Sequence, residues 1–147
     1  EKAADIEGRM RIGAIFGGGI SSEIEALGKY GRYLGVLLAV RSEFVDIFEP
    51  RELENRVKNE CLPLPILYAL KNDNCKKRIL KILSSETVSK DEAQELVEII
   101  YQTPENSYLK QRLRRLLKEA IHVLDNIRAS EAKINLKVLA MAMLEEL

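Results

Sequence analysis

Apolar residues recur three and four positions apart along almost the whole chain, the spacing that places them on one face of an α-helix. The strict alternation of apolar and polar residues that marks a half-buried β-strand is absent. The pattern therefore predicts an all-α protein, a helical bundle. The 147 residues contain no clear linker, low-complexity segment or repeat, so we expect residues 1–147 to form a single helical domain.

Local signals set the expected helix ends. Gly17–Gly19 stops the first helix, because glycines are costly to order in a helix. Ser22 with Glu25, and Ser89 with Glu92, have the spacing of capping boxes, and Ser130 is a third candidate N-cap. The expected helices are Ala3–Phe16, Ser22–Phe48, Ile66–Leu70, Cys75–Leu83 and Ser89–Tyr101, followed by one that begins at Thr103-Pro104 and one after Ser130.

Two segments carry weaker signals. The run Arg51–Asn59 is densely charged, and we expect a loop or a short, loosely held helix there. In the first helix we expect Arg9 and Arg11 to face outward, and the apolar side chains to face inward; these are Ile12, Ile15 and Phe16.

The long second helix carries three glycines on one side, Gly28, Gly31 and Gly35. Each costs about 1 kcal/mol relative to alanine inside a helix, so a compensating contact is expected. Close approach of a neighbouring helix, through Gly13 and Ala14, is the contact that we predict.

The end of this helix, Leu34–Phe48, is apolar on almost every side except for a narrow polar strip of Ser42, Glu43 and Asp46. Residues three and four apart share a helix face, so these side chains point into one space. Acidic groups within an apolar helix need a partner, because an unpaired buried charge is costly. A metal ion, a protein cation and water are the candidates, and Arg41 or Lys58 is the nearest expected cation.

Composition narrows the classes of function. Lys+Arg and Asp+Glu are both 23, which argues against a nucleic-acid or anionic-membrane binder. Cys61, Cys75 and the single His122 lack metal-ligand spacing, and two cysteines fit a reduced, cytoplasmic setting. No apolar run is long enough to span a bilayer. The segment Ile6–Arg9 is either native helix, which we favour, or the remnant of a protease site.

Six segments, in order, resemble the C-terminal half of the trans-isoprenyl diphosphate synthases, the polyprenyl synthetase family. Tyr30–Gly35 resembles the family's FGxxLG, and Leu64–Leu70 its TLPLLLAL-like segment. The remaining matches are Arg11–Gly18, Val40–Phe48, Thr87–Thr103 and Ala120–Ala140. The resemblance implies a partial isoprenoid-synthase fold, in which two aspartate-rich motifs hold Mg2+ and the diphosphate of an allylic substrate that isopentenyl diphosphate attacks.

The chain departs from the family at the residues that carry this chemistry. The second aspartate-rich motif of the family is FQxxDDxxD. In this chain Ser42 occupies the position of its first Asp and Glu43 that of its second, and only the third Asp is kept, as Asp46. The motif's Gln falls on Ala39, and the diphosphate-binding Lys before the TLP segment falls on Cys61. The first aspartate-rich motif has no counterpart here. The resemblance therefore implies at most a weak Mg2+ site at Glu43 and Asp46, and we assign no catalytic residue.

Three hypotheses follow. The chain is a synthase-like subunit, inactive alone, which forms a homo- or hetero-oligomer, with a full-length isoprenyl diphosphate synthase as a candidate partner. Alternatively, it is part of an active Mg2+-dependent prenyltransferase whose other half is missing, with allylic and isopentenyl diphosphates as substrates. The third hypothesis is a helical scaffold that binds a protein or an apolar ligand.

Overall fold

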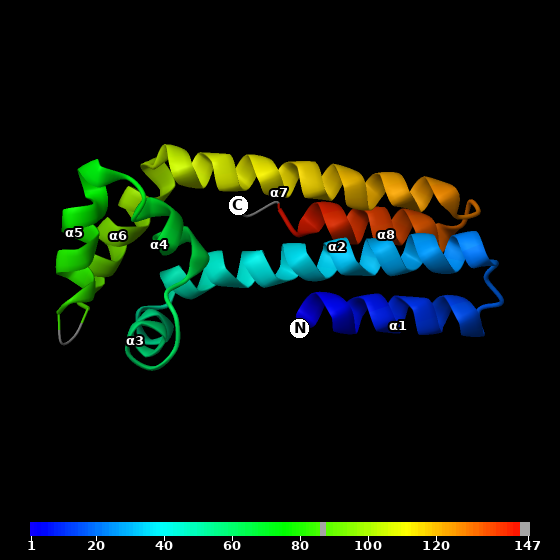
Figure 1. The fold of residues 1–147 in the computed structure, drawn as a ribbon, viewed down its shortest axis with the longest axis horizontal. Helices are drawn as coiled ribbons and strands as arrows, with labels where there is room; N and C mark the ends of the chain where they lie inside the picture. The colour runs from blue at the N-terminus through cyan, green and yellow to red at the C-terminus, as the bar shows by residue number, and fades with distance from the viewer. Residues whose placement is uncertain (86–87, 145–147) are drawn as a thin grey trace. The chain divides into compact units, whose positions relative to one another are not determined.

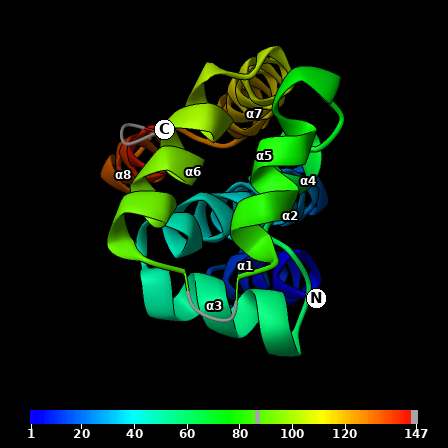
Figure 2. The same cartoon turned by 90° about the vertical axis from the view of Figure 1, so that its left-hand side faces the viewer.

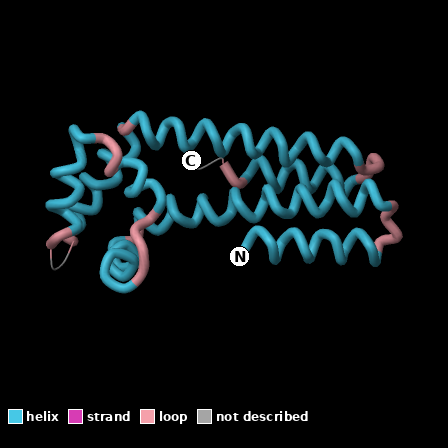
Figure 3. Tube along the Cα trace, viewed as in Figure 1, coloured by secondary structure: helices cyan, strands magenta, loops and turns pink. Residues whose placement is uncertain are grey.

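The computed structural model describes residues 1–85 and 88–144. The described residues form eight α-helices and two short 3-10 helices, without a strand, which confirms the predicted all-α fold (Figures 1 and 3). The helices are α1 Lys2–Phe16, α2 Ser21–Val45, η1 Asp46–Phe48, α3 Pro50–Asn59, α4 Leu64–Ala69, α5 Asp73–Leu83, α6 Lys90–Gln102, α7 Pro104–Val123, η2 Leu124–Asn126 and α8 Glu131–Ala142. Thr87, the first residue of one family-like segment, lies outside the described residues.

The chain divides into two compact units. One unit comprises Glu1–Arg41 with Arg112–Leu147, and the other comprises Ser42–Gln111. The helices α2 and α7 both continue from one unit into the other. The single domain expected from the sequence stays a prediction.

The first unit packs around a small core on α2, α7 and α8. Tyr30 is fully buried there, and its hydroxyl donates a 2.7 Å hydrogen bond to the main-chain oxygen of Leu136. Burial of this phenol raises its pKa to about 12, so the hydroxyl keeps its proton and remains a donor. The core consists of Tyr30, Leu34, Ala120, Leu124 and Ala140.

The glycine face of α2 receives α1, as predicted, but through other residues than Gly13 and Ala14. A Cβ at Gly31 would lie 2.8 Å from the main-chain oxygen of Ile6, and one at Gly35 would lie 2.5 Å from the Cα of Ala3. The contacts lie on the first three turns of α1, whereas Gly13 and Ala14 come later in that helix. The glycines therefore allow two helix backbones to approach closely.

The expected orientation of α1 is confirmed for Arg9, which is exposed, but is wrong for Arg11 and for the apolar residues. Phe16 is 88% exposed, and Ile12 and Ile15 are also exposed. Arg11 instead turns toward the interior and pairs with Glu7 and Glu25. Because the glycines of α2 contact the face of α1 that carries Arg11, the side chains of Ile12 and Phe16, one and five positions further on, point to other sides of the helix.

The turn between α1 and α2 forms where the glycines predict it, but α2 begins differently. Gly18 has a φ of 69°, a left-handed conformation that favours glycine. Ser22 and Glu25 do not form the expected capping box, since α2 already begins at Ser21. Instead, the Glu23 carboxylate accepts the N–H of Ile20.

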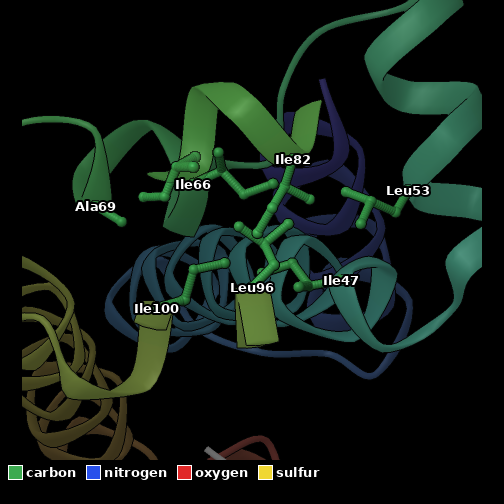
Figure 4. Close-up of a cluster of buried hydrophobic side chains, with 8 residues drawn as sticks. Ile47, Leu53, Ile66, Ala69, Ile82, Leu96 and Ile100 are labelled. Atoms are coloured by element: carbon green, nitrogen blue, oxygen red, sulfur yellow. The ribbon is translucent and has the colours of Figure 1, made fainter. Parts of the chain in front are cut away.

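The second unit contains η1 and the helices α3 to α6 (Figure 2), and a cluster of their aliphatic side chains holds it together (Figure 4). Ser89 and Glu92 form the predicted capping box of α6, as Ser130 caps α8 in the other unit. The segment Arg51–Asn59 is firmly packed, contrary to expectation, because Leu53 is fully buried. The buried cluster consists of Ile47, Leu53, Ile66, Ala69, Ile79, Ile82, Leu96 and Ile100.

Candidate functional site

The two predicted acidic residues share one cation, Arg56 of α3. Its Nη2 lies 2.9 Å from Oε2 of Glu43, and its Nη1 lies 2.7 Å from Oδ2 of Asp46. The side chain of Arg56 is 9% exposed, whereas those of Glu43 and Asp46 are 28% and 22% exposed. A planar guanidinium with several N–H donors can bind two separate carboxylates in this way.

Neighbouring main-chain groups complete this cluster, which we call the Arg56 cluster: Glu43, Asp46, Arg56, Cys61 and Leu64. The Nε of Arg56 donates a 3.1 Å hydrogen bond to the main-chain oxygen of Cys61. The N–H of Leu64, at the start of α4, donates a 3.0 Å hydrogen bond to Oε2 of Glu43. Both carboxylates and the guanidinium are therefore bound within the protein.

Local sequence explains how Arg56 reaches this position. Pro50 is the first residue of α3, where its fixed φ favours a helix and its missing N–H carries no cost. Leu53 anchors α3 in the aliphatic core, and Arg56 shares its helix face three residues later. The buried side of this charged helix thus presents a single guanidinium to the end of α2.

Arg56 remains a cation in this environment. Burial lowers the pKa of its guanidinium. Hydrogen bonding to Glu43 and the charges of Glu43 and Asp46 raise the pKa by more than burial lowers it, so the net effect is an increase. A positive charge is thus fixed between the two carboxylates. This matches the ion-paired alternative predicted from the sequence, with Arg56 as a cation that was not expected there; Lys58, one of the expected cations, pairs with Glu54.

The arrangement does not fit a magnesium ion. Mg2+ needs carboxylate oxygens that point into a free octahedral shell, and here Oε2 of Glu43 and Oδ2 of Asp46 already accept hydrogen bonds from Arg56. A second cation beside the guanidinium would also be repelled. Within residues 1–85 and 88–144, no group of three or more His, Cys, Asp or Glu residues is placed to hold a metal.

The opposite side of the same turn is apolar and aromatic. Phe44 is fully buried and meets the ring of Tyr101 edge-on at 6.4 Å between centroids, and Phe48 lies 5.9 Å from the same ring. The ammonium of Lys110 lies 3.8 Å from the centroid of Tyr101, a cation–π contact. This packing fixes the end of α2, and with it the direction of Glu43 and Asp46.

Arg56 was not among the site residues predicted from the sequence. Its signal was present but weak: Leu53, Arg56 and Val57 recur at helical spacing within an otherwise charged run. Of the other chemistry-bearing residues, Cys61 belongs to the Arg56 cluster, whereas His122 and Cys75 lie elsewhere. His122 is exposed beside Asp125, and the thiols of Cys61 and Cys75 are free. In the part of the chain that the structure describes, no helix has the length and apolar content needed to cross a membrane.

Comparison with known proteins gives one sequence match and several structural ones. No family model matches the chain. Over 50 residues, 34% of its length, the chain is 44% identical to geranylgeranyl pyrophosphate synthase 12, chloroplastic, of Arabidopsis thaliana, and it covers 14% of that protein.

The structural matches extend over nearly the whole chain. A geranylgeranyl pyrophosphate synthase of Corynebacterium glutamicum, complexed with calcium and isoprenyl diphosphate, has a TM-score of 0.79 and 22% identity, over 98% of this chain and 46% of that one. A geranylgeranyl pyrophosphate synthetase of Pyrococcus horikoshii has a TM-score of 0.75 and 21% identity, over 99% and 46%. A polyprenyl synthase of Roseobacter denitrificans has a TM-score of 0.75 and 18% identity, over 99% and 49%.

The chain spans less than half the length of these three structures, and a smaller part of the Arabidopsis protein. Structural identities this low show the fold, and the local sequence match agrees with it. The chain is a trans-isoprenyl diphosphate synthase-like protein, with the all-helical fold of these enzymes over nearly all of its own length.

Proposed function

We propose that the chain is an isoprenyl diphosphate synthase-like subunit that is inactive alone and acts in complex with a second chain. A full-length isoprenyl diphosphate synthase is the partner that we favour. The observation that carries this proposal is the Arg56 cluster, in which a protein cation binds the only two acids of the polar strip.

The chemistry of the cluster argues against independent catalysis. Metal ions that assist the departure of a diphosphate must contact both the protein and the leaving group. Glu43 and Asp46 direct oxygens to Arg56 instead, and Glu43 also accepts the N–H of Leu64. Releasing the guanidinium would leave a largely buried charge without its partners, at an energetic cost. The cluster thus stabilises the fold at the place where the resemblance implies a metal.

The exposed apolar residues of the first unit support an oligomer. Ile12, Ile15 and Phe16 of α1 are all more than half exposed, as are Ile134 and Val138 of α8. Large exposed apolar residues that gather on one element are typical of protein interfaces. These exposed residues favour a partner chain.

A second candidate function is part of a Mg2+-dependent prenyltransferase, with Glu43 and Asp46 as ligands and allylic and isopentenyl diphosphates as substrates. The similarity to geranylgeranyl pyrophosphate synthases favours it. In this function, Arg56 would have to release both carboxylates. A partner chain could cause this release if it offered other hydrogen-bond acceptors to the guanidinium.

An assay of prenyl transfer tests the proposal. The purified chain, with Mg2+, isopentenyl diphosphate and geranyl diphosphate, is expected to give no longer prenyl diphosphate above the background without protein. Mixed with a full-length synthase of the same organism, it is expected to co-elute in size-exclusion chromatography and to change the rate or the products of that enzyme.

The variant Phe16→Ser is expected to weaken the complex, because the most exposed large apolar side chain of α1 is lost. Leu80→Ser, at an exposed apolar residue of α5, is the matched control and should leave the complex intact. Product formation by the chain alone would contradict the proposal, and so would a synthase that neither binds the chain nor changes its activity.

A further inference from the structure

The first unit contains a cavity of about 360 Å³ beside α1, α2 and the beginning of α8. This volume lies within the range of small-molecule sites, which is about 300–1,000 Å³. All of its lining residues belong to the first unit, and none of them is a member of the Arg56 cluster. Its lining includes Met10, Gly13, Leu27, Arg128, Lys133 and Leu136.

The lining combines apolar side chains with cationic ones. Met10 of α1, Leu27 of α2 and Leu136 of α8 supply apolar surface. Arg128 and Lys133, which flank the start of α8, supply positive charge. An apolar pocket with a few convergent charged groups is the common form of a ligand site in proteins.

The acidic group of the lining is already neutralised. Both oxygens of Glu23 bind the guanidinium of Arg128, at 2.9 and 2.7 Å. Arg128, together with the N–H of Ile20, lowers the pKa of Glu23 to about 2, so this carboxylate remains charged and paired. The ammonium of Lys133 donates to the main-chain oxygen of Ile127, at 3.0 Å, which is a neutral group. Positive charge therefore remains at the cavity.

We propose that this cavity binds a single-chain amphiphilic anion, with the apolar chain beside Met10, Leu27 and Leu136 and the phosphate or carboxylate at Lys133. The complementary charge favours an anionic head group over a cationic or neutral one. The chain is either isoprenoid or straight, since both have the same apolar chemistry. This binding does not depend on the proposed function.

Gly13 provides a way to fill the cavity without disturbing the helices. A Cβ built on Gly13 meets no atom within 4 Å, so a side chain there has open space beside it. Gly13→Phe would place an apolar ring at the cavity lining. Gly8, on the same helix, also has open space but does not line the cavity, so Gly8→Phe is a matched control.

Isothermal titration calorimetry tests the proposal with dodecyl phosphate and farnesyl phosphate below their micellar concentrations. At least one is expected to bind with a stoichiometry of one per chain, and the tighter of the two identifies the type of chain. Gly13→Phe should weaken binding at least about tenfold, because the ring occupies space that the ligand needs, whereas Gly8→Phe should not. Lys133→Gln should weaken it about three- to fivefold, the size of one partly exposed ion pair.

Dodecyltrimethylammonium, with the same chain and the opposite charge, should bind more weakly than dodecyl phosphate. The proposal is overturned if neither phosphate binds saturably, if Gly13→Phe binds as the parent does, or if the cationic amphiphile binds equally well. Lys133→Gln provides a second test if Gly13→Phe does not fold. Since only binding is measured, failure here leaves the test of prenyl transfer unaffected.

Discussion

Replacement of Arg56 by methionine is expected to lower the free energy of unfolding by about 3 kcal/mol, the size found when one partner of a buried ion pair is removed. Methionine keeps an unbranched side chain at this position but removes the guanidinium that Glu43 and Asp46 share. The two carboxylates that Arg56 holds together would then repel each other, and the N–H of Leu64, which binds only Glu43, does not offset this. Urea denaturation followed by circular dichroism measures the change.

Two further variants isolate the cause. Lys58→Met removes a cation from the exposed side of the same helix, where it pairs with Glu54, and should change stability by less than about 1 kcal/mol. Adding Glu43→Gln and Asp46→Asn to Arg56→Met removes the repulsion and should recover a large part of the loss. If Arg56→Met proved as mild as Lys58→Met, the Arg56 cluster would not hold α3 in place.

Gly31→Ala is expected to destabilise the protein by about 1–3 kcal/mol, the usual cost of overpacking a tight contact. The added Cβ would lie 2.8 Å from the main-chain oxygen of Ile6 and 2.8 Å from Cγ of Met10. The side chain of Met10 can move, but the main chain of α1 must shift away from α2. Urea denaturation gives the change in the free energy of unfolding.

Gly8→Ala is the matched control for this prediction. Its Cβ would meet no atom within 4 Å, so only helix propensity changes, and alanine is favoured over glycine by about 1 kcal/mol. The two substitutions are chemically identical and should have opposite signs. A stabilising effect of Gly31→Ala would show that α1 does not pack tightly on the glycine face of α2.

The helical fold could be predicted because its signals are local. Apolar spacing, the capping box of Ser89 and Glu92, and the glycine stop after Phe16 each act within a few residues. The contact of α1 on the glycine face was also predictable, since three glycines on one helix side need a compensating neighbour.

Arg56 was not predicted as the partner of the acidic strip, because the choice among the cations of α3 depends on which face of that helix is buried. Nothing near Glu43 in the sequence indicates that Arg56, thirteen positions later, will be buried beside it. That outcome depends on the anchoring of Leu53 in the aliphatic core. The orientation of α1 was missed for a similar reason. The glycines of α2, rather than the apolar residues of α1, decide which side of α1 is covered.

The strip at the end of α2 therefore has two possible partners with opposite consequences for function. A magnesium ion would make Glu43 and Asp46 part of a diphosphate site, as the resemblance implies. The guanidinium of Arg56 makes them part of the packing between α2, η1 and α3. Both partners are cations, so the carboxylates can satisfy only one of them fully.

Titration of Mg2+ into the purified chain, followed by calorimetry, tests this choice most directly. The parent protein and the variant Glu43→Gln/Asp46→Asn are compared under the same conditions. We expect the two titrations to superimpose, without saturable binding, because Arg56 already binds both carboxylates. Saturable binding of Mg2+ to the parent that disappears in the variant would contradict the central role of Arg56 and restore the metal site.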